Sequence, residues 1–286
     1  MFERLSTGWE LMKQSFRVLW MDKQLIVFPA VSSVACVLVL ASFALPLWNS
    51  PYAQVVLEEG EAPQDAVAYL ILFLFYFVNY FVIVFFNSAL VACAVIRLKG
   101  GEPTVGDGFR AAAAVLPQIA GWALVSATVG VVLRIIESRS EKAGQIVAGL
   151  LGMGWTVLTY FVVPVLVVER KGPVEATKRS MAILRRTWGE ALSANLGAGL
   201  IFLLVGLVAL PALILTVVLG VFGLASGSVA LAVIGFGLFI LVLIGISLVS
   251  STLHTILLAA LYVYAAEGRV PGAFDGQVLE GAFART

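Results

Sequence analysis

Residues 229–265 read VALAVIGFGLFILVLIGISLVSSTLHTILLAALYVYA, and His254 is their only ionisable side chain apart from tyrosine. A helix needs about 20 mostly apolar residues to cross the roughly 30 Å hydrocarbon core of a bilayer. A run of this length therefore predicts a membrane-spanning helix, and it is longer than a single crossing requires.

The whole chain has the same apolar character. Of its 286 residues, 61% are hydrophobic and 12% are charged, and the mean hydropathy is +1.03. Soluble domains carry about 25% charged residues, and a water-soluble fold of this size could not bury so much apolar surface. The composition predicts an integral membrane protein whose main solvent is lipid.

Six apolar runs predict six spanning helices in an all-α, polytopic bundle, which forms a single membrane domain over residues 1–286. The runs are 24–48, 67–96, 112–135, 145–168, 192–222 and 229–265. Pro211 lies inside the fifth run. Because proline removes a helical hydrogen bond, we expect the fifth helix to break there.

Lysine and arginine are distributed unevenly along the chain. Most of the 18 lie before the first predicted span or after the second, the fourth or the sixth; the three exceptions are Arg134, Arg139 and Lys142. Loop 49–66 carries acidic residues and no basic one. Basic loops are retained on the cytoplasmic side, so this pattern predicts a multi-pass protein of the cell membrane with both termini in the cytoplasm.

A weak internal repeat accompanies the spans. Each even-numbered span ends in a similar glycine- and proline-containing stretch, at 99–103, 171–173 and 267–271. Glycine is suited to closing a helix and proline to opening the next. We predict three repeat units, each an in-plane amphipathic helix followed by a spanning hairpin, and a short tail: 1–100, 101–171, 172–270 and 271–286.

The first and last in-plane segments have apolar stripes at helical spacing. The first stripe consists of Leu5, Trp9, Met12, Phe16 and Leu19. The last consists of Val174, Met181, Leu184 and Trp188, and four cations lie away from it: Lys178, Arg179, Arg185 and Arg186. These cations fit an interfacial helix bound to anionic inner-leaflet lipids, where each charge contributes about 1 kcal/mol. Simple anchoring, with positive charge retained inside, explains the same pattern.

Several short motifs resemble those of a known family. They are GWEL at 8–11, DKQLIVFP at 22–29, VP at 163–164, Glu169, Ser180, TWG at 187–189 and FD at 274–275. Over essentially its whole length the chain resembles a family of uncharacterised prokaryotic six-span membrane proteins, classed as a domain of unknown function. The loop that follows the fourth span is also similar in style to the membrane domain of some glycerophosphodiester phosphodiesterases. The resemblance implies a prokaryotic cytoplasmic membrane and no particular substrate.

Polar residues inside the predicted spans form a candidate binding site. They are His254, Ser251, Thr255, Asn87, Thr156 and Asn79. Counting back equally from the proline that follows each unit brings His254, Thr156 and the residue next to Asn87 to equivalent positions. Under three-fold pseudosymmetry they would form one polar layer around a cavity. Hydrogen bonding between neighbouring helices explains the same residues without any binding role.

No catalytic arrangement is visible in the sequence. It has no second histidine for a metal site, no glycine-rich phosphate loop and no Ser/His/Asp set, so we expect no metal, no cofactor and no enzymatic activity. The net charge of +1 gives no reason to expect a nucleic-acid partner. Two functions remain. One is a membrane scaffold or accessory protein with a protein partner at its cytoplasmic face; the other is a transporter or a small-molecule- or lipid-binding protein with a polar mid-membrane cavity.

Overall fold

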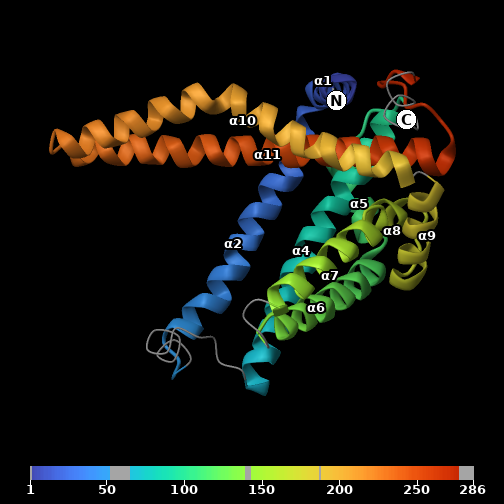
Figure 1. Cartoon of the computed structure of the whole chain (residues 1–286), viewed down its shortest axis with the longest axis horizontal. Helices are drawn as coiled ribbons and strands as arrows, with labels where there is room; N and C mark the ends of the chain where they lie inside the picture. The colour runs from blue at the N-terminus through green and yellow to red at the C-terminus, as the bar shows by residue number, and fades with distance from the viewer. Residues whose placement is uncertain (1, 52–64, 139–142, 187, 277–286) are drawn as a thin grey trace. The chain divides into compact units, whose positions relative to one another are not determined.

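The computed structural model describes residues 2–51, 65–138, 143–186 and 188–276, with the side chains of 2–8, 143, 186, 188–205 and 208 excepted. The described chain consists of helices joined by turns and short loops and contains no strand, which confirms the all-α prediction (Figure 1). Its elements are α1 (Phe2–Met21), the 3₁₀ helix η1 (Lys23–Ile26), α2 (Val27–Trp48), α4 (Ala66–Leu98), α5 (Val105–Ala113), α6 (Leu116–Ser138), α7 (Ala143–Leu158), α8 (Val162–Val168), α9 (Pro173–Arg186), α10 (Trp188–Ala225) and α11 (Val229–Glu267).

Five segments of the described chain are long and apolar enough to cross a membrane. They are Lys23–Trp48, Ala66–Leu98, Leu116–Ser138, Gly144–Val168 and Val229–Glu267. These helices indicate a multi-pass membrane protein. The predicted count of six spans is not supported, because the apolar part of α10 that the structure describes, Ala209–Ala225, is shorter than these five.

The predicted break at Pro211 is wrong. Helix α10 runs without interruption from Trp188 to Ala225, with Pro211 inside it. A proline removes one backbone donor, and neighbouring helices or local adjustment of the helix can compensate for that loss in a membrane segment.

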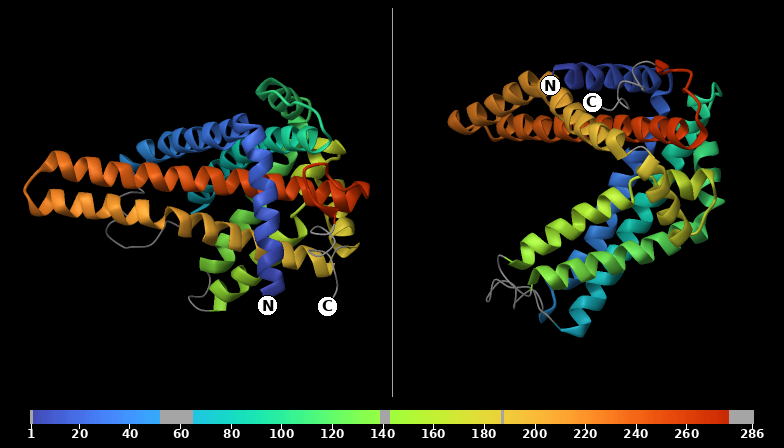
Figure 2. Two further views of the ribbon diagram at one scale, coloured as in Figure 1. Left: turned by 90° about the horizontal axis from the view of Figure 1, so that it is seen from above. Right: turned by 45° about the vertical axis from the view of Figure 1, so that its right-hand side comes forward.

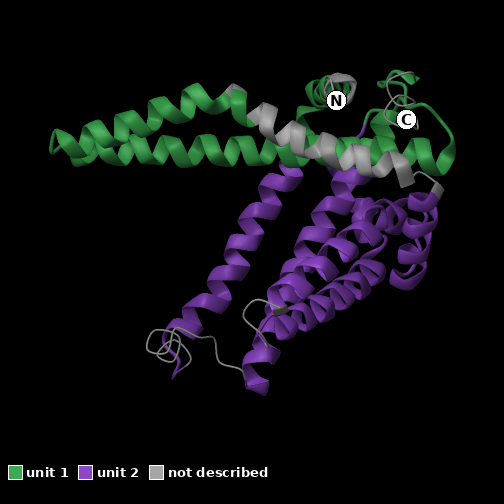
Figure 3. Cartoon of the chain, in the orientation of Figure 1, with its two compact units in different colours: residues 1–26, 94–102, 187–286 green, residues 27–93, 103–186 purple. Residues whose placement is uncertain are grey.

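The chain divides into two compact units (Figure 3). Unit 1 consists of residues 1–26, 94–102 and 187–286, and unit 2 of residues 27–93 and 103–186. In unit 1, α11 lies along α10, and α1 packs against both (Figure 1, Figure 2). In unit 2, α6 packs on α7 and α8 on α9, and α9 also contacts α6 and α7. The three-unit repeat stays a prediction.

Burial within the spans is concentrated at one end of each helix. We call the ends next to a basic segment the inner ends, and the opposite ends the outer ends. Among the described residues of the five candidate spans, the buried side chains larger than serine all lie in the inner half of their helix. In α4 they begin at Val84, and in α11 at Thr252. The inner ends are therefore packed as a protein core, whereas the outer ends expose apolar side chains suited to lipid.

Candidate functional site

Helix α9 is held in place by an acidic residue that pairs with two cations. Glu169 caps the C-terminus of α8, and Arg170 follows it with a φ of 54°, a left-handed conformation that turns the chain toward α9. Glu169 Oε1 lies 2.9 Å from Arg179 Nε, and Glu169 Oε2 lies 2.5 Å from Lys171 Nζ. We call this arrangement the Glu169 clamp. It joins the end of α8 to the middle of α9.

A second contact of α9 satisfies backbone groups at a point where a helix is interrupted. The chain leaves helical geometry between the end of α7 at Leu158 and the start of α8 at Val162. The hydroxyl of Ser180 donates to the Leu158 carbonyl at 2.8 Å and accepts from the Phe161 N–H at 3.1 Å. Ser180 is fully buried. One hydroxyl on α9 thus satisfies a donor and an acceptor that the interruption frees, and buried backbone groups require such partners.

The surface of α9 that faces away from these contacts carries cations. Lys178 and Arg185 are exposed, and neither forms an ion pair with any residue of the described chain. Val174 is 65% exposed on the same face, so the predicted apolar stripe of α9 is wrong at that position. The buried face instead consists of Ala176, Ser180, Ile183 and Leu184.

Of the four predicted lipid-contacting cations, two are therefore available. Arg179 is half-buried and its guanidinium is engaged in the Glu169 clamp. The side chain of Arg186 lies outside the described residues. Lys178 and Arg185 remain as the cations of α9 that can meet a lipid headgroup, and lipid binding itself stays a prediction.

The predicted polar layer is distributed over both units. His254, Ser251 and Thr255 lie in unit 1, whereas Asn87, Thr156 and Asn79 lie in unit 2. Several of these groups bond within their own helix. Thr255 Oγ1 donates to the Ser251 carbonyl at 3.0 Å, Thr156 Oγ1 to Gly152 at 2.9 Å, and Asn79 Nδ2 to Phe75 at 3.0 Å.

The hydrogen bonds of these side chains do not test the predicted polar layer. Thr156 is exposed, Asn87 and His254 are half-buried, and the bonds of Thr156, Thr255 and Asn79 satisfy those groups locally. A hydroxyl bonded to the carbonyl four residues earlier is a common way to accommodate serine or threonine in an apolar helix. The layer and its cavity stay a prediction.

In unit 1, polar contacts join segments that are far apart in the sequence. Arg97 Nε lies 2.5 Å from Asp22 Oδ2, and Lys99 Nζ lies 2.7 Å from Glu267 Oε1. The tail adds two bonds, from Gly272 N–H to the Leu98 carbonyl and from Asp275 N–H to Gln14 Oε1, both at 3.2 Å. We call these four contacts the helix-end node. It joins the ends of α1, α4 and α11 to the tail.

The helix-end node was missed by reasoning from the sequence. The motifs DKQLIVFP and FD drew attention to Asp22 and Asp275, but sequence spacing gave no sign of their partners. The node also involves the stretches that end the second and sixth predicted spans, at 99–103 and 267–271, which were predicted only to close one helix and open the next.

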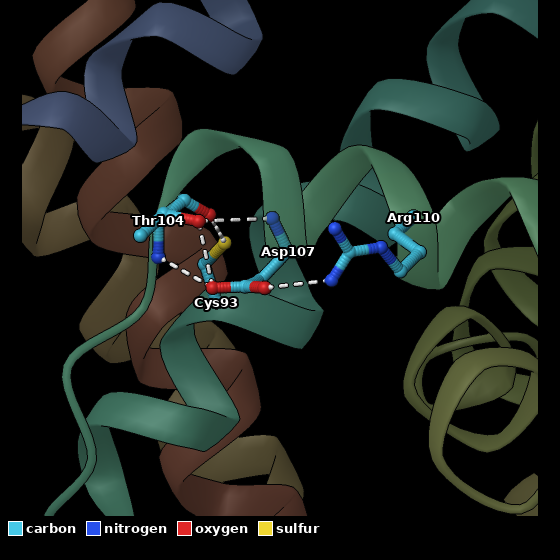
Figure 4. Close-up of polar contacts among 4 residues, drawn as sticks. All are labelled: Cys93, Thr104, Asp107 and Arg110. Atoms are coloured by element: carbon cyan, nitrogen blue, oxygen red, sulfur yellow. Dashed lines mark hydrogen bonds and ion pairs between the residues drawn. The ribbon is translucent and has the colours of Figure 1, made fainter.

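In unit 2, the start of α5 is fixed by a reciprocal cap (Figure 4). Asp107 N–H donates to the Thr104 hydroxyl at 3.2 Å, and the Asp107 carboxylate accepts from the Thr104 N–H at 3.0 Å and from its hydroxyl at 2.7 Å. These bonds hold the pKa of Asp107 below its ordinary value, with a smaller contribution from Arg110. Cys93 Sγ donates to the Thr104 carbonyl at 3.4 Å and so attaches the cap to α4. The arrangement is the capping box expected at a helix N-terminus.

The described side chains offer little chemistry beyond ion pairing. Among them, no group of three histidine, cysteine, aspartate or glutamate residues is close enough to hold a metal ion. Six of the seven ion pairs described lie next to basic segments, and the remaining one joins Arg134 to Glu137 at the outer end of α6.

One known protein family matches most of this chain. The model of a family described as "Family of unknown function (DUF6159)" matches residues 66–272, which is well over half of the chain. The chain belongs to this family. No curated protein matches it. The predicted membership of a family of unknown function is thus confirmed, whereas the similarity to the membrane domain of glycerophosphodiester phosphodiesterases is not supported.

The DUF6159 match covers α4 through α11 and the first residues of the tail. It therefore includes the Glu169 clamp, Ser180 and three of the segments that meet in the helix-end node. Helix α1 and Asp22 lie before the matched range. Because the family has no assigned function, membership adds no activity to any of these residues.

Proposed function

We propose that this DUF6159 protein is a non-enzymatic scaffold or accessory protein of a prokaryotic cell membrane. In this proposal α10 is the fifth of six spans, since its 38 residues extend for about 57 Å. Both termini lie in the cytoplasm with the basic segments. The helices α1, α5 and α9 are the in-plane amphipathic helices of three related units.

The location of the polar contacts carries the proposal. In the described residues, contacts between distant segments cluster at the inner ends: the helix-end node, the Glu169 clamp and the Ser180 bonds. Polar groups in the spans, such as Thr156 and Asn79, bond to their own helices. A protein that fixes the geometry of its cytoplasmic side and leaves its spans apolar is suited to presenting a surface rather than to moving a solute.

Helix α9 is the surface we assign to the anionic inner leaflet. The Glu169 clamp and Ser180 fix two of its faces, which leaves Lys178 and Arg185 on the exposed one. Each such cation contributes about 1 kcal/mol near an anionic surface. A protein partner would then dock at the cytoplasmic face.

One observation favours the alternative, a transporter or ligand-binding protein. The fourth span is interrupted between α7 and α8, and interrupted helices are common where transporters bind their substrates. His254 is the only histidine and is half-buried. In that case the polar groups of the spans would contact a solute.

The experiment combines crosslinking with native mass spectrometry of the full-length protein. In native membranes, an amine-reactive crosslinker should join inner-end lysines, such as Lys99 and Lys178, to one recurring protein. Purified protein should retain anionic phospholipid, and the Lys178→Gln/Arg185→Gln variant should retain less. A small molecule that co-purifies in fixed stoichiometry and is lost from a folded His254→Ala variant would reject the scaffold role and support transport.

A further inference from the structure

Helix α1 has two opposite faces of different chemistry. The buried face consists of Leu11, Gln14, Ser15, Val18 and Leu19, and it belongs to the helix that packs against α10 and α11. On the opposite side, three large aromatic side chains are exposed, with Trp9 at 38%, Phe16 at 46% and Trp20 at 65%. We call these three residues the aromatic face. They follow helical spacing over three turns, so they form one continuous stripe.

The aromatic face differs from the stripe predicted from the sequence in one respect. Trp9 and Phe16 belonged to that stripe and are exposed, whereas Leu19 belonged to it and is buried. The packing of unit 1 uses a face that includes the polar side chains of Gln14 and Ser15. The large aromatic side chains of α1 therefore remain exposed.

Cations accompany the aromatic rings. Lys13 Nζ lies 5.5 Å from the ring centre of Trp9, and Lys23 Nζ lies 4.5 Å from that of Trp20. Phe16 stacks on Trp20 with ring centres 6.0 Å apart. Cation–π contacts of this kind keep positive charge close to the apolar surface. The lipid headgroup boundary matches both components of this surface, because it has an apolar side for the aromatic rings and anionic groups for the cations.

The acidic residues near this face are neutralised by ion pairs. Glu10 pairs with Lys13 at 2.8 Å, and Asp22 pairs with Arg97. Arg17 and Lys23 have no ion pair with any residue of the described chain. The described side chains around the aromatic face therefore carry a net positive charge, which is complementary to anionic headgroups.

The chain itself brings the C-terminal end of α1 to a membrane surface. The first candidate span begins at Lys23, three residues after Trp20. The C-terminal turn of α1 must therefore lie at the boundary where that span leaves the hydrocarbon. Tryptophan and lysine are the residues enriched at this boundary.

We propose that the aromatic face of α1 binds the anionic headgroup region of the bilayer, with Trp9, Phe16 and Trp20 inserted at the acyl boundary and Arg17 and Lys23 on the phosphates. This contact is separate from the one assigned to α9. It rests on the in-plane placement of α1 in the proposed function, but it requires neither a scaffold role nor a protein partner, so its failure would leave those two parts of the proposed function standing.

The test measures the depth of individual tryptophans in the full-length protein. We would reconstitute it in nanodiscs of phosphatidylcholine and phosphatidylglycerol, with part of the phosphatidylcholine brominated near the carbonyl end of its acyl chains. Subtracting the emission of Trp20→Phe or Trp9→Phe from that of the parent isolates the contribution of each residue. Trp122→Phe is the control, because Trp122 is buried in unit 2 and stacked on Trp155.

We expect the brominated lipid to quench the emission of Trp20 and Trp9, and aqueous iodide to leave it unchanged. The Trp122 contribution should respond to neither quencher. Replacing phosphatidylglycerol by phosphatidylcholine, or introducing Arg17→Gln/Lys23→Gln, should increase iodide quenching of Trp20. Iodide quenching of both residues without quenching by brominated lipid would overturn the proposal and leave a protein as the occupant. If neither iodide nor brominated lipid quenched Trp9 and Trp20, the proposal would be overturned in favour of a second copy of the chain covering this face.

Discussion

The two halves of α11 lie in different environments although both are apolar. In residues 229–249, large side chains such as Val229, Leu241 and Ile244 are exposed, which suits hydrocarbon. In residues 250–267 most side chains are buried, including the polar ones of Ser250, Thr252 and Thr255. The helix has 39 residues and extends for about 58 Å, nearly twice the thickness of a hydrocarbon core. Hydropathy alone could not separate the half that crosses lipid from the half that packs.

This division changes the position expected for His254. It lies in the packed half, about 38 Å along the helix from Val229. His254 therefore lies among packed side chains and not among the exposed apolar ones of the outer half. Helix α4 has the same division, with side chains exposed or half-buried up to Ile83 and mostly buried from Val84 onward.

Breaking an ion pair should give the largest difference in stability between inner and outer ends. At the inner end the side chains of Arg97 and Asp22 are only 21% and 9% exposed, whereas at the outer end those of Arg134 and Glu137 are 49% and 42% exposed. Arg97→Gln leaves a nearly buried carboxylate unpaired, and we expect it to lower the free energy of unfolding by about 3 kcal/mol. Arg134→Gln should lower it by about 0.3 kcal/mol, as for exposed helical pairs.

The measurement is unfolding of the purified full-length protein in detergent, with both single variants and the Asp22→Asn/Arg97→Gln double variant. The double variant should be more stable than the sum of its single changes predicts, because it leaves no unpaired charge. Equal effects of Arg97→Gln and Arg134→Gln would mean that the inner end is not a packed core.

The outer half of α11 approaches the backbone of α10 closely, which provides a further test of the comparison. A Cβ on Gly235 would lie 2.2 Å from the backbone nitrogen of Gly220 in α10, a distance that no side-chain rotation can relieve. We expect Gly235→Ala to destabilise the protein by about 2 kcal/mol through overpacking. Gly237→Ala is the matched control, because a Cβ there meets nothing within 4 Å.

Thermal unfolding monitored by size-exclusion fluorescence would compare the two glycine variants. The close approach of α10 and α11 through glycine is the mode by which membrane helices associate without large buried side chains. If Gly235→Ala and Gly237→Ala behaved alike, the outer hairpin would not be held by this contact.

Ser180 tests a neutral contact at an inner end. Ser180→Ala leaves the Leu158 carbonyl and the Phe161 N–H without their hydroxyl partner, and we expect a loss of about 1–2 kcal/mol. Ser42→Ala is the control at an outer position, where the hydroxyl bonds only to the Val39 carbonyl of its own helix. Its effect should stay within about 0.5 kcal/mol.

Hydrogen exchange around residues 158–162 would show whether the loss in Ser180→Ala is local. We expect faster exchange in that stretch and unchanged exchange in α6. Unchanged exchange at the interruption would show that Ser180 does not hold it.

Much of the fold followed from hydropathy. The runs 24–48, 67–96, 112–135 and 229–265 correspond to α2, α4, α6 and α11 with differences of a few residues. The run 145–168 did not reveal that it divides into α7 and α8. Proline is tolerated in the first turn of a helix, so Pro164 gave no sign of an interruption before it. The interruption also depends on Ser180, which the sequence separates from it.

The candidate site was less accessible to the sequence. Glu169, Ser180 and Asp22 lay within motifs that carried the family resemblance, but their partners come from other segments. Charge distribution identified the cations of α9 as a group, and it could not show that Arg179 would be paired. A stripe defined by spacing also cannot tell whether a helix turns it toward protein or lipid, as Phe16 and Leu19 of α1 illustrate.

The smallest effect concerns the cap of α5, which is exposed although it lies next to an inner end. The Thr104 bonds lower the pKa of Asp107 in the folded protein. Its contribution to stability is therefore complete above the ordinary aspartate pKa of about 3.9 and is lost as the pH falls through the lowered value. Wild-type protein should lose stability below about pH 4 relative to Asp107→Asn, which accepts hydrogen bonds but carries no charge. Unfolding measured from pH 6 to pH 3 on both proteins checks this, with Thr104→Ala as the variant that should reduce the difference between them. Parallel pH profiles of wild type and Asp107→Asn would mean that the carboxylate adds nothing to the cap, and that the inner ends owe their stability to buried contacts such as those of Arg97 and Ser180.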